Sequence, residues 1–113
     1  MEKLEYTTQK QGFDISVSWE NEHCSIYDCF DETEEQYKKM ISNLEIGVDY
    51  HVIIKVAASK AGIELGNDYL GSVYDSCHPE EMVSQGLHGY LDDMIANAIC
   101  EAEQTLVKLS VPQ

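Results

Sequence analysis

Residues 50–58 read YHVIIKVAA, and this stretch decides the fold. It is rich in β-branched and apolar side chains and contains neither glycine nor proline, which favours a central strand with much of both faces covered. Residues 13–19 (FDISVSW) alternate apolar and polar side chains instead. That alternation predicts a strand with one buried face. The two segments together predict a β-sheet.

Weaker strand signals lie on either side of these two segments. Residues 1–12 alternate loosely and end at Gly12, which predicts a short strand and a turn. Residues 23–30 (HCSIYDCF) are interpreted as a partner strand that ends near Cys29. The glycine-punctuated stretch after residue 60 predicts a hairpin that turns near Gly66-Asn67-Asp68.

Residues 31–45 predict the first main helix. Asp31 or Thr33 can cap its N-terminus, and acidic residues crowd the first turn, where the helix dipole favours negative charge. Gly47 is a plausible stop signal. Two i,i+4 ion pairs are expected along the helix, Glu34 with Lys38 and Glu35 with Lys39. The spacing of the apolar residues predicts a buried stripe made of Tyr37, Met40, Ile41 and Leu44.

Pro79, followed by two glutamates, predicts the start of a short helix that breaks at Gly86 or Gly89. Residues 87–109 predict the second main helix, because apolar residues recur there at three- and four-residue steps. The sequence therefore predicts one α+β domain over residues 1–113. We expect an antiparallel β-sheet of about four strands packed on two main α-helices, residues 31–45 and 87–109.

The charge balance is the most unusual property of this composition. The 113 residues hold 21 acidic residues, seven lysines and no arginine, for a formal net charge of -14. Solubility alone needs a magnitude of only about 2–8 in a small domain. Such an excess repels nucleic-acid phosphate and anionic lipid, and it favours a strongly basic protein partner. We expect no direct nucleic-acid binding and no membrane association.

The acids gather in two stretches that contain no base, from Phe13 to Glu35 and from Glu64 to Asp93. If both stretches share a face, their carboxylates can imitate the phosphate rows of a duplex and occupy a basic cleft. The alternative is an ordinary solvated surface. The predicted partner-binding residues are Asp14, Glu20, Glu22, Asp28, Asp31, Glu32, Glu34, Glu35, Glu64, Asp68, Asp75, Asp92 and Asp93.

No motif predicts catalysis or a cofactor. His23-Cys24 and Cys77-His78 carry ligand types that zinc accepts, but they lack the paired spacing of a zinc site. The chain opens without an apolar leader, so we expect a cytoplasmic protein whose cysteines are reduced. We therefore predict a non-enzymatic protein with no cofactor and no metal.

Three short segments carry a resemblance. Residues 62–71 (GIELGNDYLG), followed by Tyr74-Asp75-Ser76 and by residues 89–94 (GYLDDM), resemble small acidic proteins encoded in phage and prophage genomes. The likeness covers roughly residues 50–100 and transfers no active site. In size and charge the chain also resembles phage-encoded anti-CRISPR and anti-restriction inhibitors, several of which mimic DNA.

The resemblance and the charge lead to one hypothesis, that of an acidic inhibitor, monomeric or homodimeric, that blocks the nucleic-acid-binding surface of a host defence complex. The alternatives are an immunity or antitoxin protein that neutralises a basic nuclease toxin, and a small acidic interaction domain of another role.

Overall fold

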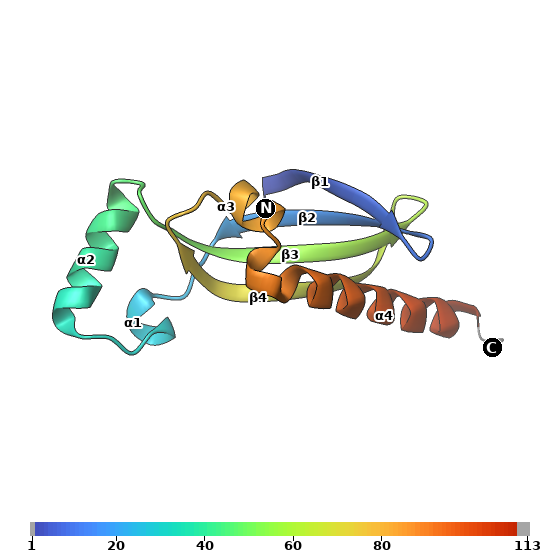
Figure 1. Ribbon diagram of the computed structural model, residues 1–113. Coiled ribbons are helices and arrows are strands. Elements are labelled where there is room, and N and C mark those ends of the chain that lie inside the picture. The colour runs from blue at the N-terminus through green and yellow to red at the C-terminus, as the bar shows by residue number, and fades with distance from the viewer. Residues whose placement is uncertain (1, 111–113) are drawn as a thin grey trace.

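A four-stranded antiparallel sheet with strand order β1-β2-β3-β4 forms the body of the protein (Figure 1). The computed structural model describes residues 2–110, with the side chains of residues 8–110. The strands are β1 (Glu2–Lys10), β2 (Phe13–Asn21), β3 (Tyr50–Lys60) and β4 (Ile63–Asp75). The predicted α+β class is confirmed, since this sheet packs against the long C-terminal helix α4 (Tyr90–Ser110) and a shorter helix.

The register of β2 and β3 explains the core. Ile15 lies opposite Ala58, and Val17 lies opposite Val56, so the apolar sides of both strands face the same way. All four of these side chains are buried. α4 covers this face with a stripe of side chains that are also buried: Leu91, Met94, Ile95, Ala98, Ile99 and Ala102. The strand predicted over residues 13–19 and the helix predicted over residues 87–109 are therefore both confirmed.

α4 lies directly against β4 at Gly66. A Cβ atom added to this glycine would lie 2.2 Å from the carbonyl oxygen of Ala98 and 2.5 Å from the amide nitrogen of Ala102. Gly66 is thus a point of close approach between strand and helix. The predicted hairpin turn at Gly66-Asn67-Asp68 is wrong, because β3 and β4 are joined at Ala61-Gly62 and residues 66–68 lie within β4.

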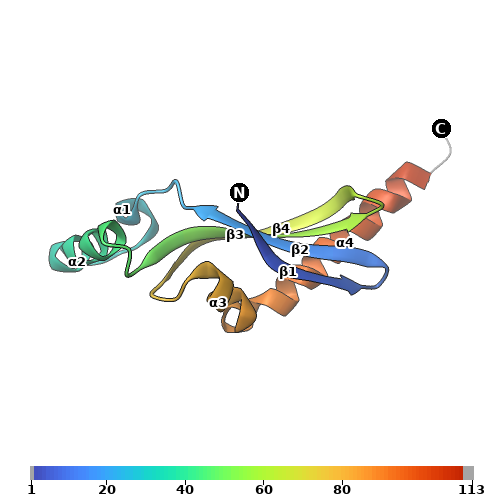
Figure 2. The ribbon, with the colours of Figure 1, turned by 90° about the horizontal axis from the view of Figure 1, so that it is seen from above.

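The short helix predicted at Pro79 is confirmed as α3 (Pro79–Ser84), which buries Met82 and Val83 and lies on the same side of the sheet as α4 (Figure 2). Gly86, in the left-handed region with φ 84°, separates α3 from a 3-10 turn, η1 (Leu87–Gly89), that leads into α4. The predicted break in the helix pattern is therefore confirmed at Gly86.

Two further helices lie between β2 and β3. Residues 23–30 were predicted to form a strand, but they contain the short helix α1 (Ile26–Cys29), because the Ser25 side chain accepts a hydrogen bond from the Tyr27 amide and caps a helical turn. The helix predicted at residues 31–45 is α2 (Glu34–Glu45), capped by Thr33. Gly47, with φ 77°, follows its C-terminus as predicted.

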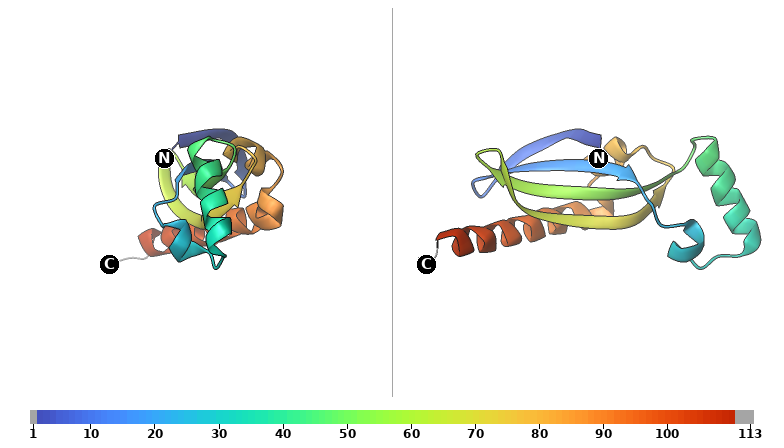
Figure 3. Two further views of the ribbon diagram at one scale, coloured as in Figure 1. Left: turned by 90° about the vertical axis from the view of Figure 1, so that its left-hand side faces the viewer. Right: turned by 180° about the vertical axis from the view of Figure 1, so that it is seen from behind.

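α2 projects from one end of the sheet and does not lie on its face (Figure 1). No α2 residue is buried, so the predicted buried stripe is wrong, and its apolar side chains are only half-buried. α4 extends past the opposite end of the sheet (Figure 3). The molecule is consequently elongated, with extents of 58 × 27 × 22 Å and a radius of gyration of 16.6 Å. A compact domain of this length would have a radius of gyration of about 13 Å.

Candidate functional site

Residues 22–49 form the projecting end, and their backbone is held by local contacts. Thr33 accepts a hydrogen bond from the Gln36 amide, which fixes the start of α2. The Tyr37 hydroxyl donates to the Phe30 carbonyl and accepts from the Glu32 amide. Cys24 and Cys29 were predicted to be reduced thiols, but they are joined by a disulfide that encloses α1. These contacts hold the connection between α1 and α2 in one conformation.

Five of the predicted partner-binding acids gather on this end of the molecule. All five side chains are exposed, and their carboxylates make neither a hydrogen bond nor an ion pair with any described residue. The predicted pairs Glu34–Lys38 and Glu35–Lys39 do not come within ion-pair distance, so the lysines of α2 leave these charges uncompensated. We call this group the acidic tip: Asp28, Asp31, Glu32, Glu34 and Glu35.

The three predicted acids of β2 and the residues just after it lie elsewhere and have partners. Asp14, near the opposite end of the sheet, accepts a hydrogen bond from the Gln9 amide at 2.8 Å. Glu20 lies 3.9 Å from the imidazole of His23. Glu22 accepts from the backbone amides of Ser72 at 2.7 Å and Cys24 at 3.2 Å. Its carboxylate therefore bridges β4 and the base of the projecting end.

Three of the five predicted partner-binding acids in the second stretch also have partners. Glu64 pairs with Lys55 at 2.8 Å and accepts from Asn67, which lowers the pKa of its carboxyl. Asp68 accepts from Asn97 of α4 at 3.1 Å.

Asp75 accepts from the Cys77 amide and lies 3.1 Å from His88, and these two contacts lower its pKa. Asp92 and Asp93 are exposed in the first turn of α4. The structure thus separates the two acidic stretches: the tip lies at one end, and the second group is spread along β4 and α4. They do not make one continuous face.

A polar cluster that the sequence analysis missed lies where the projecting end joins the sheet. The Tyr74 hydroxyl donates to an Asp49 carboxylate oxygen at 2.6 Å. His51 is 8% exposed, and its ring lies 5.5 Å from that of Phe30 and 6.1 Å from that of Tyr74. A histidine within the apolar run of residues 50–58 was the one available signal of this cluster.

Electrostatics in this cluster follow from burial and hydrogen bonding. Burial lowers the pKa of His51, and the carboxylate of Glu22 only partly offsets that effect. Partial burial alone would raise the pKa of Glu22, but the amides of Ser72 and Cys24 hold it below its ordinary value. Burial and the Asp49 carboxylate raise the pKa of the Tyr74 hydroxyl. At neutral pH the cluster therefore holds a carboxylate at Glu22, a neutral imidazole and a protonated phenol.

A cavity of about 390 Å³ opens beside this cluster. Its walls come from the end of β2, the end of α2 and the start of β3, so three separate elements enclose it. The lining residues are Asn21, Glu22, Leu44, Gly47, Asp49, Tyr50 and His51.

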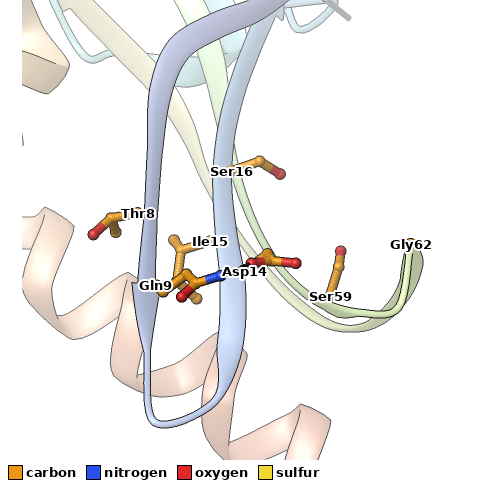
Figure 4. A pocket seen from close by; sticks show the side chains of 7 residues that line it. All are labelled: Thr8, Gln9, Asp14, Ile15, Ser16, Ser59 and Gly62. Atoms are coloured by element: carbon orange, nitrogen blue, oxygen red, sulfur yellow. Dashed lines mark hydrogen bonds between the residues drawn. The ribbon is translucent and has the colours of Figure 1, made fainter.

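A second cavity, of about 500 Å³, lies near the tips of the β1–β2 and β3–β4 hairpins (Figure 4). Asp14 is the one titratable side chain among its lining residues, and Gln9 already donates to that carboxylate. Thr8, Ser16 and Ser59 supply hydroxyl groups. These groups form a shallow polar hollow with no base placed beside a nucleophile among the residues that line it.

Within residues 8–110, no three His, Cys, Asp or Glu side chains are grouped so that they could hold a metal ion. No helix of the described chain is both long and apolar enough to cross a membrane. Comparison of the chain with protein-family models, with curated proteins and with solved structures finds no match.

Proposed function

We propose that this protein is a non-catalytic acidic inhibitor that binds the basic, nucleic-acid-binding surface of a host defence complex, such as a CRISPR effector or a restriction enzyme. The acidic tip is the leading contact. The partner's lysines and arginines meet its carboxylates in place of phosphates, and the bound protein excludes the nucleic acid.

The uncompensated charge of the acidic tip carries this proposal. Asp14, Glu22, Glu64, Asp68 and Asp75 are engaged in contacts within the protein, whereas the carboxylates of the tip have no partner among the described residues. An exposed charge without an internal partner keeps its full attraction for an external one, and clustered charges accelerate the encounter.

Exposed apolar side chains in the same projecting end support an interface there. Tyr27 is 49% exposed, Ile46 68% and Val48 49%. Protein interfaces commonly combine apolar and aromatic contacts with a charged rim. The projecting end thus offers both components.

The test is a competition experiment with labelled target duplex and the purified defence complex of the source host. Fluorescence anisotropy follows the release of DNA as the protein is added. We expect displacement that weakens as salt rises, because screening reduces the attraction between exposed charges. The triple variant Asp31→Asn/Glu34→Gln/Glu35→Gln should compete about 10-fold less well, since three exposed charge pairs of about 0.5 kcal/mol each are lost.

A matched control separates the acidic tip from the net charge. The variant Glu80→Gln/Glu101→Gln/Glu103→Gln removes the same charge from exposed positions on α3 and α4. It should compete as well as the unmodified protein. Equal weakening of both triple variants would show that the tip has no special role. Neutralisation of a nuclease toxin without any effect on defence complexes would instead favour the immunity role.

A further inference from the structure

His51 lies at the junction of the projecting end and the sheet, and it contacts residues of both. Its backbone carbonyl accepts a hydrogen bond from the Glu22 amide at 2.9 Å, at the point where β2 leads into the projecting end. Its buried imidazole packs against the ring of Phe30, from the projecting end, and the ring of Tyr74, from β4. Phe30 covers this imidazole only while the projecting end stays docked on the sheet.

The imidazole of His51 lacks a hydrogen-bond partner at Nε2. Among the residues that the structure describes, this is the one buried side-chain nitrogen or oxygen of that kind, and such groups are rare in folded proteins. In the neutral tautomer protonated on Nδ1, Nε2 is only an unused acceptor. A protonated imidazole is a donor at both nitrogens, and a buried charged N–H group without an acceptor costs much more free energy. The docked arrangement therefore disfavours the charged form.

Glu22 is the charged group that acts on His51 from the end of β2. Its carboxylate attracts a protonated imidazole, but neither oxygen reaches Nε2. One oxygen accepts from the Ser72 amide and the other from the Cys24 amide, so the carboxylate is held in place. Burial outweighs the attraction of Glu22, and the pKa of His51 is lowered as a result.

The other elements packed against His51 do not supply an acceptor either. From β4, the Tyr74 hydroxyl donates to Asp49, and burial together with this carboxylate raises the pKa of Tyr74, so the phenol stays protonated. From the projecting end, the contact is the ring of Phe30, which does not titrate. Protonation of His51 in the docked state would thus leave a buried charge without a hydrogen bond at Nε2.

The projecting end is attached to the sheet by few contacts. None of residues 22–49 belongs to the buried hydrophobic cluster that joins the sheet to α3 and α4. The polar contacts include those of Glu22 with β3 and β4, and those of the Tyr74 hydroxyl with Asp49 and the Met40 carbonyl. Segments with few buried apolar contacts open at a lower free-energy cost than the whole protein. The projecting end can therefore undock while the rest of the molecule stays folded (Figure 1).

We propose that His51 is a pH switch: its neutral form keeps the projecting end docked, and its protonation releases Phe30 and α1 from the sheet. Water then solvates both ring nitrogens. The open form takes up a proton more readily than the docked form, because the pKa of His51 is lowered by docking. Opening therefore increases as the pH falls below 6.5, the ordinary pKa of histidine, by at most about 10-fold per pH unit.

The switch has a consequence for partner binding, and this consequence rests on the proposed function. Undocking lets the acidic tip move relative to the sheet. A partner must then order the tip as it binds, which costs affinity. The proposed inhibition of a defence complex should therefore weaken in acid.

Hydrogen exchange of the full-length native protein, followed by NMR, tests the switch. Protection factors, which correct for the effect of pH on intrinsic exchange, are measured at pH 7.5 and 5.5. The amides of Glu22, Phe30 and Ser72 report on the junction, and the Ala98 amide within α4 reports on global unfolding. We expect the junction amides to be less protected than Ala98 at both pH values and to lose up to about 10-fold of their protection at pH 5.5. Equal protection and a parallel loss at all four amides would show that exchange requires global unfolding, and would overturn the inference.

Variants separate His51 from other titrating groups. His51→Phe keeps an aromatic ring beside Phe30 but takes up no proton, so the junction amides should be equally protected at pH 7.5 and 5.5. His23→Gln is the matched control, since it removes an exposed imidazole from the same projecting end, and it should retain the full loss. Phe30→Ala uncovers His51 without removing it, so protection should already be low at pH 7.5 and fall little further. A loss in His51→Phe as large as in the unmodified protein, or a full loss in Phe30→Ala, would overturn the inference.

Failure of this inference can be told apart from failure of the proposed function, because exchange is measured without a partner. If His51→Phe leaves the pH dependence of the junction unchanged while the triple variant of the tip loses competition with DNA, the switch is wrong and the function stands. If the exchange results are as expected but no defence complex is inhibited at either pH, the switch stands and the proposed function is wrong.

Discussion

Replacement of Gly66 by alanine should destabilise the protein by about 3 kcal/mol. The new Cβ would lie 2.2 Å from the Ala98 carbonyl oxygen, 2.5 Å from the Ala102 nitrogen and 3.1 Å from the Ala102 Cα, all of them backbone atoms of α4. A contact at 2.2 Å must lengthen by roughly 1 Å before repulsion subsides. No side-chain rotation relieves it, so α4 must move away from β4, and the movement loosens the contacts of buried residues on that face of the helix. Overpacking of this kind costs about 1–3 kcal/mol, and the rigid backbone places this site at the upper end.

Gly71 on the same strand provides the control. A Cβ there meets just one atom within 4 Å, a side-chain oxygen of Glu22 at 3.4 Å, which is an ordinary contact. Gly71→Ala should change the free energy of unfolding by less than about 1 kcal/mol, because it also reduces the freedom of the unfolded chain.

Urea unfolding followed by circular dichroism measures the free energy of unfolding of both variants. In a thermal melt, the Tm of Gly66→Ala should be about 12 °C below that of the unmodified protein, at about 4 °C per kcal/mol. A Gly66→Ala protein within 1 kcal/mol of the unmodified one would refute the close contact of α4 with β4.

Two further predictions concern the projecting end and its junction with the sheet. Burial depresses the pKa of His51 in the folded protein, where Glu22 and Tyr74 are its titratable neighbours. In the unfolded chain the pKa of this histidine is 6.5, so the unfolded state takes up a proton more readily than the folded state. The neutral form therefore contributes stability above pH 6.5, and this stability is lost as the pH falls below that value. Urea unfolding at pH 7.5 and 5.5 should show a loss of at most about 1.4 kcal/mol that is absent in His51→Leu; the same pH slope in both proteins would contradict this. The Cys24–Cys29 disulfide predicts two titratable thiols in the denatured, unreduced protein, Cys77 and Cys100, and four after reduction. Cys24→Ser/Cys29→Ser should cost about 2 kcal/mol for so short a loop, and four thiols before reduction would show that the bond is absent.

The strands were predictable where the order of apolar and polar residues directly reflects which face of the strand is buried. Alternation in residues 13–19 reflects one buried face, and β2 has that pattern of burial. The turn predicted at Gly66 is wrong because glycine is favoured both in turns and where two backbones approach closely, and Gly66 is the second case. The real turns are Gln11-Gly12 and Ala61-Gly62, in which both residues have positive φ as in two-residue hairpins of type I′. The turn at Gly12 was predicted and is confirmed, whereas the turn at Ala61-Gly62 was missed, since alanine rarely takes this conformation.

The helix at residues 34–45 shows a different limit. Its apolar periodicity identified a helix with one apolar side, but periodicity does not tell which element covers that side. Here the cover is incomplete, because α2 lies beyond the end of the sheet. The candidate site has a related limit: composition counts carboxylates and does not show which are paired. Glu22 and Glu35 look equivalent in the sequence, yet Glu22 links β4 to the base of the projecting end through two backbone amides, whereas Glu35 is unpaired among the described residues.

The position of residues 22–49 within the topology has a consequence for how such a protein can evolve. β2 and β3 are neighbours whose ladder runs to the Asn21–Val52 pair, so the whole projecting end is an excursion from a hairpin connection. Extending a connection costs little chain entropy, about 0.6 kcal/mol for each doubling of its length. The hydrophobic cluster between the sheet and its helices contains no residue from 22–49, so mutations, insertions and deletions there leave that cluster untouched. The surface proposed here for partner binding can thus change within a lineage that inherits the same framework.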